Sequence, residues 1–408
     1  MLLVFPLWTG FDGYAQITRW KFIFYAVVTC IWSVLLIFFA LRERTVPRRC
    51  GIFALLCAAF LAWACVSAAC SEYGSQTLLG YRYDGLLPLF LYAATALGCA
   101  AYGSMRKCYV NLLAVSCSLC CLVAVLQLLG FNPLWLYPDG MNYYDGGILY
   151  ASTFLGTMGN TNLLGAFLCI SVPLFAFTAL YERGTRLWLL IPSALALAVL
   201  ILSKSEAGLV GSAAALLMGI ICYVNLRHGR KAALIALAVE AALVLLALAA
   251  IYFAAPQSGT LYELSEILHG RIRDEFGSSR VAIWREGYRL FCERPMLGGG
   301  PGTFGLRSTL EFTRFIPETG ATLVTRADNA HCELLGCLAD MGVPGALLCL
   351  SAWGYMAWRW LKGSAPAAGT ALASYFVQSF FGLGTCFILP LVSILFGLTV
   401  SKHNDLST

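Results

Sequence analysis

Residues 232–254 read AALIALAVEAALVLLALAAIYFA, an apolar run whose single carboxylate is Glu240, and runs of this kind decide the fold class. An α-helix needs about 20 apolar residues to cross a hydrocarbon core about 30 Å thick. Similar runs recur along the chain from residue 22 to residue 401. The sequence therefore predicts an integral membrane protein.

The composition supports the same prediction. Of the 408 residues, 60% are hydrophobic and only 12% are charged, whereas about a quarter of the residues of a soluble domain are charged. A membrane β-barrel would need short strands of alternating polarity, and these apolar runs do not alternate. We expect an all-α fold, a polytopic membrane helical bundle.

Eleven apolar segments qualify as predicted spans. Residues 1–21 precede them and contain an apolar start that is too short to span. The predicted spans are residues 22–41, 51–70, 85–103, 109–130, 162–181, 187–203, 206–225, 232–254, 339–361, 368–384 and 386–401.

Basic residues predict the orientation, because Lys and Arg are retained in cytoplasmic loops. They follow every odd-numbered span, which places the N-terminus outside and the C-terminus inside. Three units result: residues 1–254 with eight spans, a large external loop at 255–338, and residues 339–408 with three spans and a tail. The basic residues that follow odd-numbered spans are Arg42, Arg44, Arg48, Arg49, Arg106, Lys107, Arg183, Arg186, Arg227, Arg230, Lys231, Arg359, Lys362 and Lys402, while Arg19, Lys21 and Arg82 break the pattern.

The seventeen cysteines and the net charge of +6 do not identify a function. Most cysteines lie within apolar runs, where a thiol behaves as a small hydrophobe. The Cys117-x-x-Cys120 spacing lies within a span and has no second pair nearby, so a metal site is not favoured. The basic residues are spread between spans, so no nucleic-acid partner is expected.

Two shorter external loops are rich in aromatic residues beside carboxylates. These are residues 71–84 and residues 131–150. An aromatic face and nearby acceptors suit a sugar, but aromatic residues also form belts at the headgroup level of membranes. The belt is the somewhat favoured interpretation. The second loop contains Trp135, Tyr137, Asp139, Tyr143, Tyr144, Asp145 and Tyr150.

The external loop contains the residues most suited to chemistry. An amphipathic helix is predicted from Ser278 to Arg294, with Arg280 and Trp284 on one face. Residues 255–331 hold nine arginines and no lysine. The guanidinium fork suits phosphate oxygens, but nine acidic residues share the segment. We therefore expect most of these arginines to form solvated pairs and one or two to bind a ligand.

The same loop ends on a glycine turn and a histidine. Gly298 to Gly302 form a tight turn, which either approaches a phosphate or simply returns the chain to the membrane. His331 lies where the loop re-enters the membrane, and an imidazole there is suited to accepting a proton from a hydroxyl. Catalysis by His331 is a hypothesis at this point.

Taken together, these motifs resemble the O-antigen ligase and polymerase superfamily of bacterial membrane glycosyltransferases. The resemblance rests on Arg280-x-x-x-Trp284, on the segment from Arg294-Pro295 through the glycine turn to Phe304, and on His331 with Gly342-x-x-Gly345. Gly159 to Asn162 looks like the family's Gly-Asn-x-Asn segment. The family has about twelve spans, so the chain looks one short at its N-terminus.

The resemblance implies a metal-independent transfer without a cofactor. A glycan would move from undecaprenyl diphosphate to an acceptor hydroxyl on the outer face of the cytoplasmic membrane, in surface polysaccharide biosynthesis. The acceptor would be a glycan, a lipid, a protein or a wall polymer. His331 would assist the acceptor, and Arg280 would hold the diphosphate. The further substrate-binding candidates are Lys204, Trp284, Arg82, Asn160 and Asn162.

Lys204 follows Ser203 where the family commonly has a Ser-Arg pair, so its contact with the diphosphate would be a point charge rather than a fork. Glu206 either pairs with Lys204 or lies at the lipid boundary. Glu240 either has a structural partner in the bundle, which is favoured, or relays a proton. A transporter of a small solute or ion is the alternative function, which Glu240 and the prolines at 173 and 192 would suit.

Overall fold

The structure is a computed structural model that describes residues 1–43, 51–137, 144–145, 148–149, 154–182, 185–316, 321–382 and 384–401. It is largely helical, with two short hairpins, which confirms the predicted all-α helical bundle. Several predictions concern residues outside the described ranges: Arg44, Arg48, Arg49, Asp139, Tyr143, Tyr150, Arg183 and Lys402.

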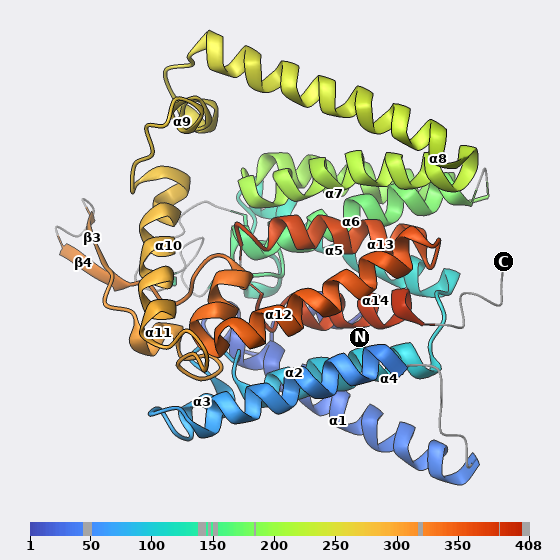
Figure 1. Ribbon diagram of the computed structural model, residues 1–408, viewed down its shortest axis with the longest axis horizontal. Coiled ribbons are helices and arrows are strands. Elements are labelled where there is room, and N and C mark those ends of the chain that lie inside the picture. Colours follow the sequence, from blue (N-terminus) through green and yellow to red (C-terminus); the bar gives the residue numbers. More distant parts are fainter. Residues whose placement is uncertain are drawn as a thin grey trace.

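The elements follow the chain as drawn in Figure 1. The helices are α1 (Ile17–Glu43), α2 (Gly51–Ala69), α3 (Gln76–Leu79), α4 (Leu86–Tyr102), α5 (Lys107–Leu128), α6 (Thr161–Tyr181), α7 (Leu190–Leu202), α8 (Glu206–Ala254), α9 (Gly259–Leu268), α10 (Phe276–Glu293), α11 (Phe304–Arg307), α12 (Glu333–Leu361), α13 (Pro366–Gln378) and α14 (Leu389–Val400). The strands are β1 (Tyr144–Asp145), β2 (Ile148–Leu149), β3 (Glu311–Ile316) and β4 (Ala321–Arg326).

Each of the eleven predicted spans overlaps a helix. Six described helices are long and apolar enough to cross a membrane, namely α1, α2, α5, α6, α8 and α12, and three shorter apolar helices lie at 86–102, 187–202 and 389–400. The 49-residue α8 covers two predicted spans. The number of crossings stays a prediction, because α13 has only 13 residues.

Glycines break the two longest helices. Gly229 of α8 has a φ of 82°, so the chain turns between 206–228 and 230–254 at the basic loop that the sequence indicated. Gly342 of α12 has a φ of 67°, and Pro344 follows it. A proline is tolerated there because the first turn of a new helical segment needs no backbone donor. The part of α12 before Gly342 therefore lies at the end of the bundle, and the part after Gly342 forms the predicted membrane span.

The bundle is built around α6, whose side chains are almost all buried. Helix α13 packs against α6 and α8, α14 packs against α4, and α12 packs against α2. The second part of α8 lies at the top of Figure 1, apart from the centre of the bundle, and most of its side chains are exposed. A helix that is apolar and exposed in this way is suited to contact with lipid.

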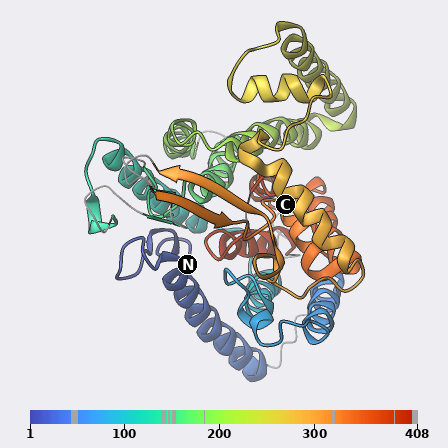
Figure 2. The same ribbon diagram turned by 90° about the vertical axis from the view of Figure 1, so that its left-hand side faces the viewer.

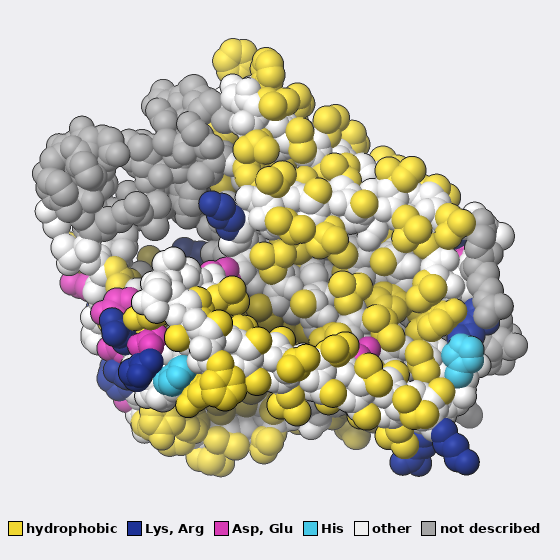
Figure 3. Space-filling model, turned by 90° about the horizontal axis from the view of Figure 1, so that it is seen from above, with side chains coloured by type: hydrophobic (Ala, Val, Ile, Leu, Met, Phe, Trp, Pro, Cys, Tyr) yellow, Lys and Arg dark blue, Asp and Glu magenta, His cyan; other side chains and the backbone are white. Residues whose placement is uncertain are grey.

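The loops predicted to face the cytoplasm lie together at one end of the bundle. Lys107 pairs with Glu182 at 3.3 Å. Arg359 donates to the carbonyl of Ser401, whose hydroxyl donates to the carbonyl of Gly103. These contacts join loops that follow four different odd-numbered spans, as alternating topology requires. Figure 3 shows a face with a broad hydrophobic area and charged side chains mainly towards its ends.

The opposite end carries the segment 255–338. Figures 1 and 2 show α9, α10, α11 and the β3–β4 hairpin at this end. The strands are antiparallel, and Glu311 lies opposite Arg326. The hairpin was not predicted from the sequence, which indicated only a partly helical loop.

Lys21, one of the exceptions to the charge pattern, is buried near this end. Its ammonium group donates to the carbonyls of Phe5 and Pro6 at 3.1 and 3.3 Å, and it lies over the ring of Phe387. It holds the first residues of the chain against the bundle. Lys21 therefore does not report on loop orientation.

Candidate active site

Two cavities meet at His331. The smaller one is polar and has a volume of about 290 Å³. It contains four of the residues singled out from the sequence. Its lining residues are Thr161, Asn162, Lys204, Glu206, Ser278, Arg280 and His331.

This polar cavity lies where the N-termini of four helices converge. Thr161 and Asn162 belong to the first turn of α6, and Glu206 is the first residue of α8. Ser278 and Arg280 lie at the start of α10, and His331 lies two residues before α12. Free backbone N–H groups and the helix dipole favour an anion at each helix N-terminus. The convergence therefore favours binding of an anion.

Three of the lining residues have an unusual backbone. Lys204, Ser278 and His331 have φ values of 52°, 59° and 45°. Such left-handed conformations are costly for residues other than glycine, by roughly 1–3 kcal/mol each, and they cluster at functional sites. In α10, Gly277 and Ser279 are left-handed as well, so the helix begins through a left-handed turn rather than at a simple serine cap.

His331 is held by a hydrogen bond of its backbone, and no described residue forms a hydrogen bond with its ring. Its backbone N–H donates to the side-chain oxygen of Asn329 at 2.8 Å, and the Asn329 amide donates to Asp328 at 3.1 Å. Nδ1 of His331 is buried and has no hydrogen-bond partner in the described chain. The pKa of the imidazole is lowered to about 4. Burial is the main cause, and the positive charges of Arg280 and Arg82 contribute to the same shift. The ring is therefore neutral at pH 7.

Arg280 differs from the other described arginines of its segment. It donates to the carbonyl of Gly277 at 2.7 Å, but its Nε is buried without a partner in the described chain. Its guanidinium forms no ion pair with a described residue, and burial lowers its pKa. Six others are paired with carboxylates, as predicted for most of the set: Arg271, Arg273, Arg285, Arg289, Arg294 and Arg307.

The structure places Lys204 and Asn162 with Arg280 and His331, but not the other three candidates. Asn160 caps α6, because its side-chain oxygen accepts from the N–H of Asn162 at 2.8 Å. Trp284 packs against Phe381, with ring centroids 6.0 Å apart, and its indole N–H has no partner among the described residues. Arg82 pairs with Asp328 and lines the second cavity instead.

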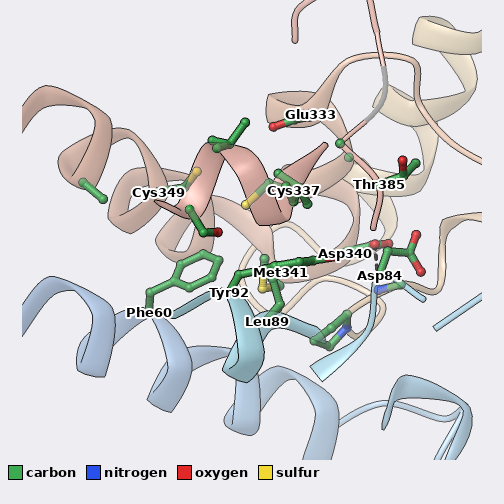
Figure 4. Close-up of a pocket in the computed structure, with 18 of the residues that line it drawn as sticks. Phe60, Asp84, Leu89, Tyr92, Glu333, Cys337, Asp340, Met341, Cys349 and Thr385 are labelled. Atoms are coloured by element: carbon green, nitrogen blue, oxygen red, sulfur yellow. Dashed lines mark hydrogen bonds between the residues drawn. The ribbon is translucent and has the colours of Figure 1, made fainter. Parts of the chain in front are cut away.

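The second cavity is larger, about 330 Å³, and runs between α2, α4, α12 and α14. Figure 4 shows Asp84, Asp340 and Thr385 towards one side of it and Phe60 and Cys349 towards the other. Glu333 also lines it and accepts a hydrogen bond from the hydroxyl of Tyr375. Burial raises the pKa of Asp84. The cavity therefore has a carboxyl-rich end next to His331 and an apolar end.

The glycine turn has a structural role here. The N–H groups of Gly299 and Gly300 donate to the carbonyls of Ala339 and Asp340 at 3.0 and 2.8 Å. The carboxylate of Asp340 accepts from the N–H of Gly302 at 3.0 Å. The turn is thus fixed to α12 just before its break, which agrees with the interpretation that it returns the chain to the bundle.

Sequence reasoning left four lining carboxyls out of the site: Glu206, Asp84, Glu333 and Asp340. Glu206 was expected to pair with Lys204 or to lie at the lipid boundary, but it accepts a hydrogen bond from the hydroxyl of Thr260 and lines the polar cavity. Glu333 had one sequence signal, since it lies two residues after His331. Asp84 ends the aromatic loop 71–84 that the sequence singled out, whereas Asp340 had no sequence signal, and only the fold places both on one cavity.

The structural partner favoured for Glu240 is not found among the described residues. The Oε2 atom of Glu240 is buried without a hydrogen-bond partner among the described residues. Of the external aromatic residues, Trp135 is 87% exposed, whereas Tyr137 is buried edge-to-face against Tyr14. Tyr137 therefore offers no platform to a sugar.

The comparisons with known proteins agree with the motif resemblance. The O-antigen ligase family model matches residues 191–350. That segment includes Lys204, Arg280 and His331 together with the glycine turn. No curated protein sequence matches the chain significantly. The match supports the resemblance of this chain to the O-antigen ligase and polymerase superfamily over residues 191–350.

Proposed function

We propose that the protein transfers a glycan from undecaprenyl diphosphate to an acceptor hydroxyl on the outer face of the bacterial cytoplasmic membrane, in surface polysaccharide biosynthesis. The observation that carries this proposal is the polar cavity that Arg280 and His331 line together, since each has a buried nitrogen without a hydrogen-bond partner among the described residues. The family match supports the general class of reaction.

The diphosphate of the donor occupies the polar cavity in this proposal. Arg280 and Lys204 provide positive charge, and the converging helix N-termini add N–H donors. Fixed donors at the place where negative charge develops contribute about 3–4 kcal/mol each at comparable sites. These groups neutralise the leaving diphosphate without a metal ion, so we propose a metal-independent transfer.

His331 takes the proton of the acceptor hydroxyl. The acceptor oxygen forms a bond to the anomeric carbon of the glycan, and the bond from that carbon to the phosphate oxygen breaks. The bonding electron pair leaves with undecaprenyl diphosphate, and the acceptor proton moves to the imidazole. A neutral imidazole is required for this step, and His331 is neutral at pH 7.

The location of the cavity favours transfer over transport. Substrate sites of transporters lie near the bilayer midplane, often at interrupted helices. The polar cavity lies instead at the N-terminal ends of α6, α8 and α10. Glu240 lies within a predicted span and does not line it.

The test uses purified protein and an undecaprenyl-diphosphate-linked glycan, with release of undecaprenyl diphosphate as the readout. Release with transfer is expected from the wild type and not from His331→Ala. Chains that lengthen with donor alone identify a polymerase, and a reaction that starts only when another acceptor is added identifies a ligase. Wild-type release without a transferred glycan, or full activity of His331→Ala, would contradict the proposal.

A further inference from the structure

We propose that α9 lies in the interface of the lipid bilayer, with its apolar face on the acyl chains, at the end of the bundle that carries residues 255–338. Its partner is the phospholipid surface itself. No step of the proposed transfer reaction uses a side chain of this helix.

The helix is inverted relative to a surface helix of a soluble domain. Ser265 and Glu266 face the protein and are only 2% and 7% exposed. The apolar side chains of Leu261, Ile267 and Leu268 face outwards and are 54%, 42% and 37% exposed. A helix that faces water buries its apolar side instead. The outer face of α9 is therefore suited to a neighbour that is not water.

The direction of α9 agrees with a position in the membrane plane. In Figure 1, α6, α8 and α12 run across the page, whereas α9 is seen nearly end-on. It lies close to the end of α8 that leads into it, and nearer to the bundle than the β3–β4 hairpin. Because the long helices of the bundle cross the membrane, a helix that lies across them runs along the membrane surface. Amphipathic helices in this orientation bury their apolar face about 5–10 Å into the boundary between headgroups and acyl chains.

Aromatic residues indicate the same level in the membrane. Tyr252, near the end of α8, stacks on His269 at the end of α9, with ring centroids 4.1 Å apart and ring planes 8° apart. Phe253, the next residue of α8, is 83% exposed. Tyrosine is enriched at membrane–water interfaces because its ring is apolar and its hydroxyl is polar. The stack joins α9 to the end of an apolar, exposed helix at this level.

The two carboxylates of α9 have partners on the side that faces the protein. Glu266 pairs with Arg271 at 2.6 Å and with Arg273 at 3.8 Å. Glu263 accepts a hydrogen bond from the backbone N–H of Gly277 at 2.8 Å. The charges of the helix are therefore compensated away from its apolar face, as contact with lipid requires.

The exposed apolar surface continues from α9 onto the second part of α8, where Leu245 and Leu246 are also exposed. This continuity favours lipid over a second copy of the chain as the partner. A helix of ten residues is about 15 Å long. Its face alone is too small for a specific protein interface, which buries about 1,200 Å² or more.

The same helix is hydrogen-bonded to the polar cavity. Thr260 donates to Glu206, which lines the cavity. Glu263 binds the N–H of Gly277, and the carbonyl of Gly277 accepts from Arg280 at 2.7 Å. The consequence for catalysis rests on the proposed function: the diphosphate of a lipid-linked donor lies at headgroup depth, and α9 holds Arg280 at that depth.

The test is photolabelling of the wild-type protein in phosphatidylcholine nanodiscs. Two phosphatidylcholine probes are compared, one with a diazirine next to the acyl carbonyl and one with a diazirine at the terminal methyl. The first probe should label peptides of α9 more strongly than the second, whereas both should label the second part of α8. The β3–β4 hairpin is the internal reference and should remain unlabelled.

Substitution of the apolar face provides a second measurement. Leu261→Glu combined with Leu268→Glu removes two apolar side chains from the lipid, so labelling of α9 by the first probe should fall about tenfold. Val324→Glu is the matched control, because Val324 is an exposed apolar residue of β4. It should leave the labelling of α9 unchanged. The comparison of the two probes uses no substitution, so a folding defect of the double variant does not decide the result.

Three results would overturn the inference. One is labelling of α9 no stronger than that of the hairpin, which would place the helix in water. Another is equal labelling of α9 by both probes, which would place it deeper than the interface. The third is covalent crosslinking of α9 to α9 of a second copy in place of lipid labelling.

A transfer assay in the same nanodiscs separates this inference from the proposed function. Slower transfer by the double variant, with normal transfer by Val324→Glu, supports the connection between α9 and the site. Full transfer by a double variant whose α9 is no longer labelled contradicts that connection. Lipid labelling of α9 in a wild-type protein that transfers no glycan contradicts the proposed function and supports the membrane position of α9.

Discussion

Arg280 and His331 line one polar cavity, and each has a buried nitrogen without a hydrogen-bond partner in the described chain, Nε and Nδ1 respectively. An unpaired buried donor or acceptor costs about 1–3 kcal/mol. Because both residues line the anion-favouring cavity, we expect the bound substrates to provide partners for their side chains.

Replacement of His331 by Ala removes the proposed proton acceptor. Loss of a positioned acid or base typically lowers a rate by 10²–10⁴-fold, so we expect a fall of this size in glycan transfer, measured with purified donor. Donor binding should change little, since the diphosphate is held mainly by Arg280 and Lys204. A large loss of donor binding with a normal maximal rate would contradict the assigned role.

Replacement of Arg280 tests the diphosphate contact. Arg280→Ala should lower kcat by about 10²–10³-fold, and Arg280→Lys should remain poor because the planar fork is lost. Lys204→Arg should be tolerated. Arg285→Ala is the matched control on the same helix, since Arg285 is exposed and pairs with Asp274 at 2.6 Å. Equal losses in Arg280→Ala and Arg285→Ala would indicate a general effect on α10 instead.

Glycan transfer should lose activity on the acid side only at an unusually low pH. His331 works in its neutral form, and its pKa of about 4 keeps it neutral until the pH falls towards that value. The pH dependence of kcat/KM reports the pKa values of the free enzyme. Its acid inflection should therefore lie well below pH 6.5, the usual pKa of histidine. Bound diphosphate adds negative charge and raises the pKa of His331, so the acid inflection of kcat should lie at higher pH. A kcat/KM inflection near 6.5 that disappears in a His331 variant would contradict the buried environment.

The break in α12 should be sensitive to a side chain. In Gly342→Ala the new Cβ would lie 2.2 Å from the carbonyl oxygen of Met296, at a φ of 67°. The backbone conformation alone costs an L-residue about 1–3 kcal/mol, so the thermal midpoint in detergent should fall clearly. Gly354→Ala is the control in the same helix, because its Cβ meets nothing within 4 Å. It should be neutral or slightly stabilising. Equal midpoints for the two variants would show that the break at Gly342 is not required.

The sequence predicted the bundle well because apolar length is a local property, and each of the eleven segments contains a helix or part of one in the structure. It also selected Arg280, His331, Lys204 and Asn162, because their residue types and motifs indicate phosphate binding and proton transfer. It did not indicate the β3–β4 hairpin, or that Trp284 and Arg82 lie outside the polar cavity. Asp84 and Asp340 line the larger cavity because segments far apart in the sequence pack together. Periodicity and composition do not predict such contacts.

Two native cysteines and one introduced cysteine test the predicted orientation. Cys292 is exposed on α10 in the external segment, and Cys108 is exposed in the first turn of α5, beside Lys107 at the opposite end. A membrane-impermeant maleimide applied to intact spheroplasts should modify Cys292 and leave Cys108 unmodified, as read by peptide mass spectrometry. Permeabilised membranes should then show modification of Cys108 as well.

Cys292→Ser identifies the peptide signal, and a cysteine introduced at Leu310 should react like Cys292 because it lies in the same external segment. Modification of Cys108 alone from outside would invert the orientation and would place the polar cavity on the cytoplasmic side, where the proposed acceptors on the cell surface cannot reach it.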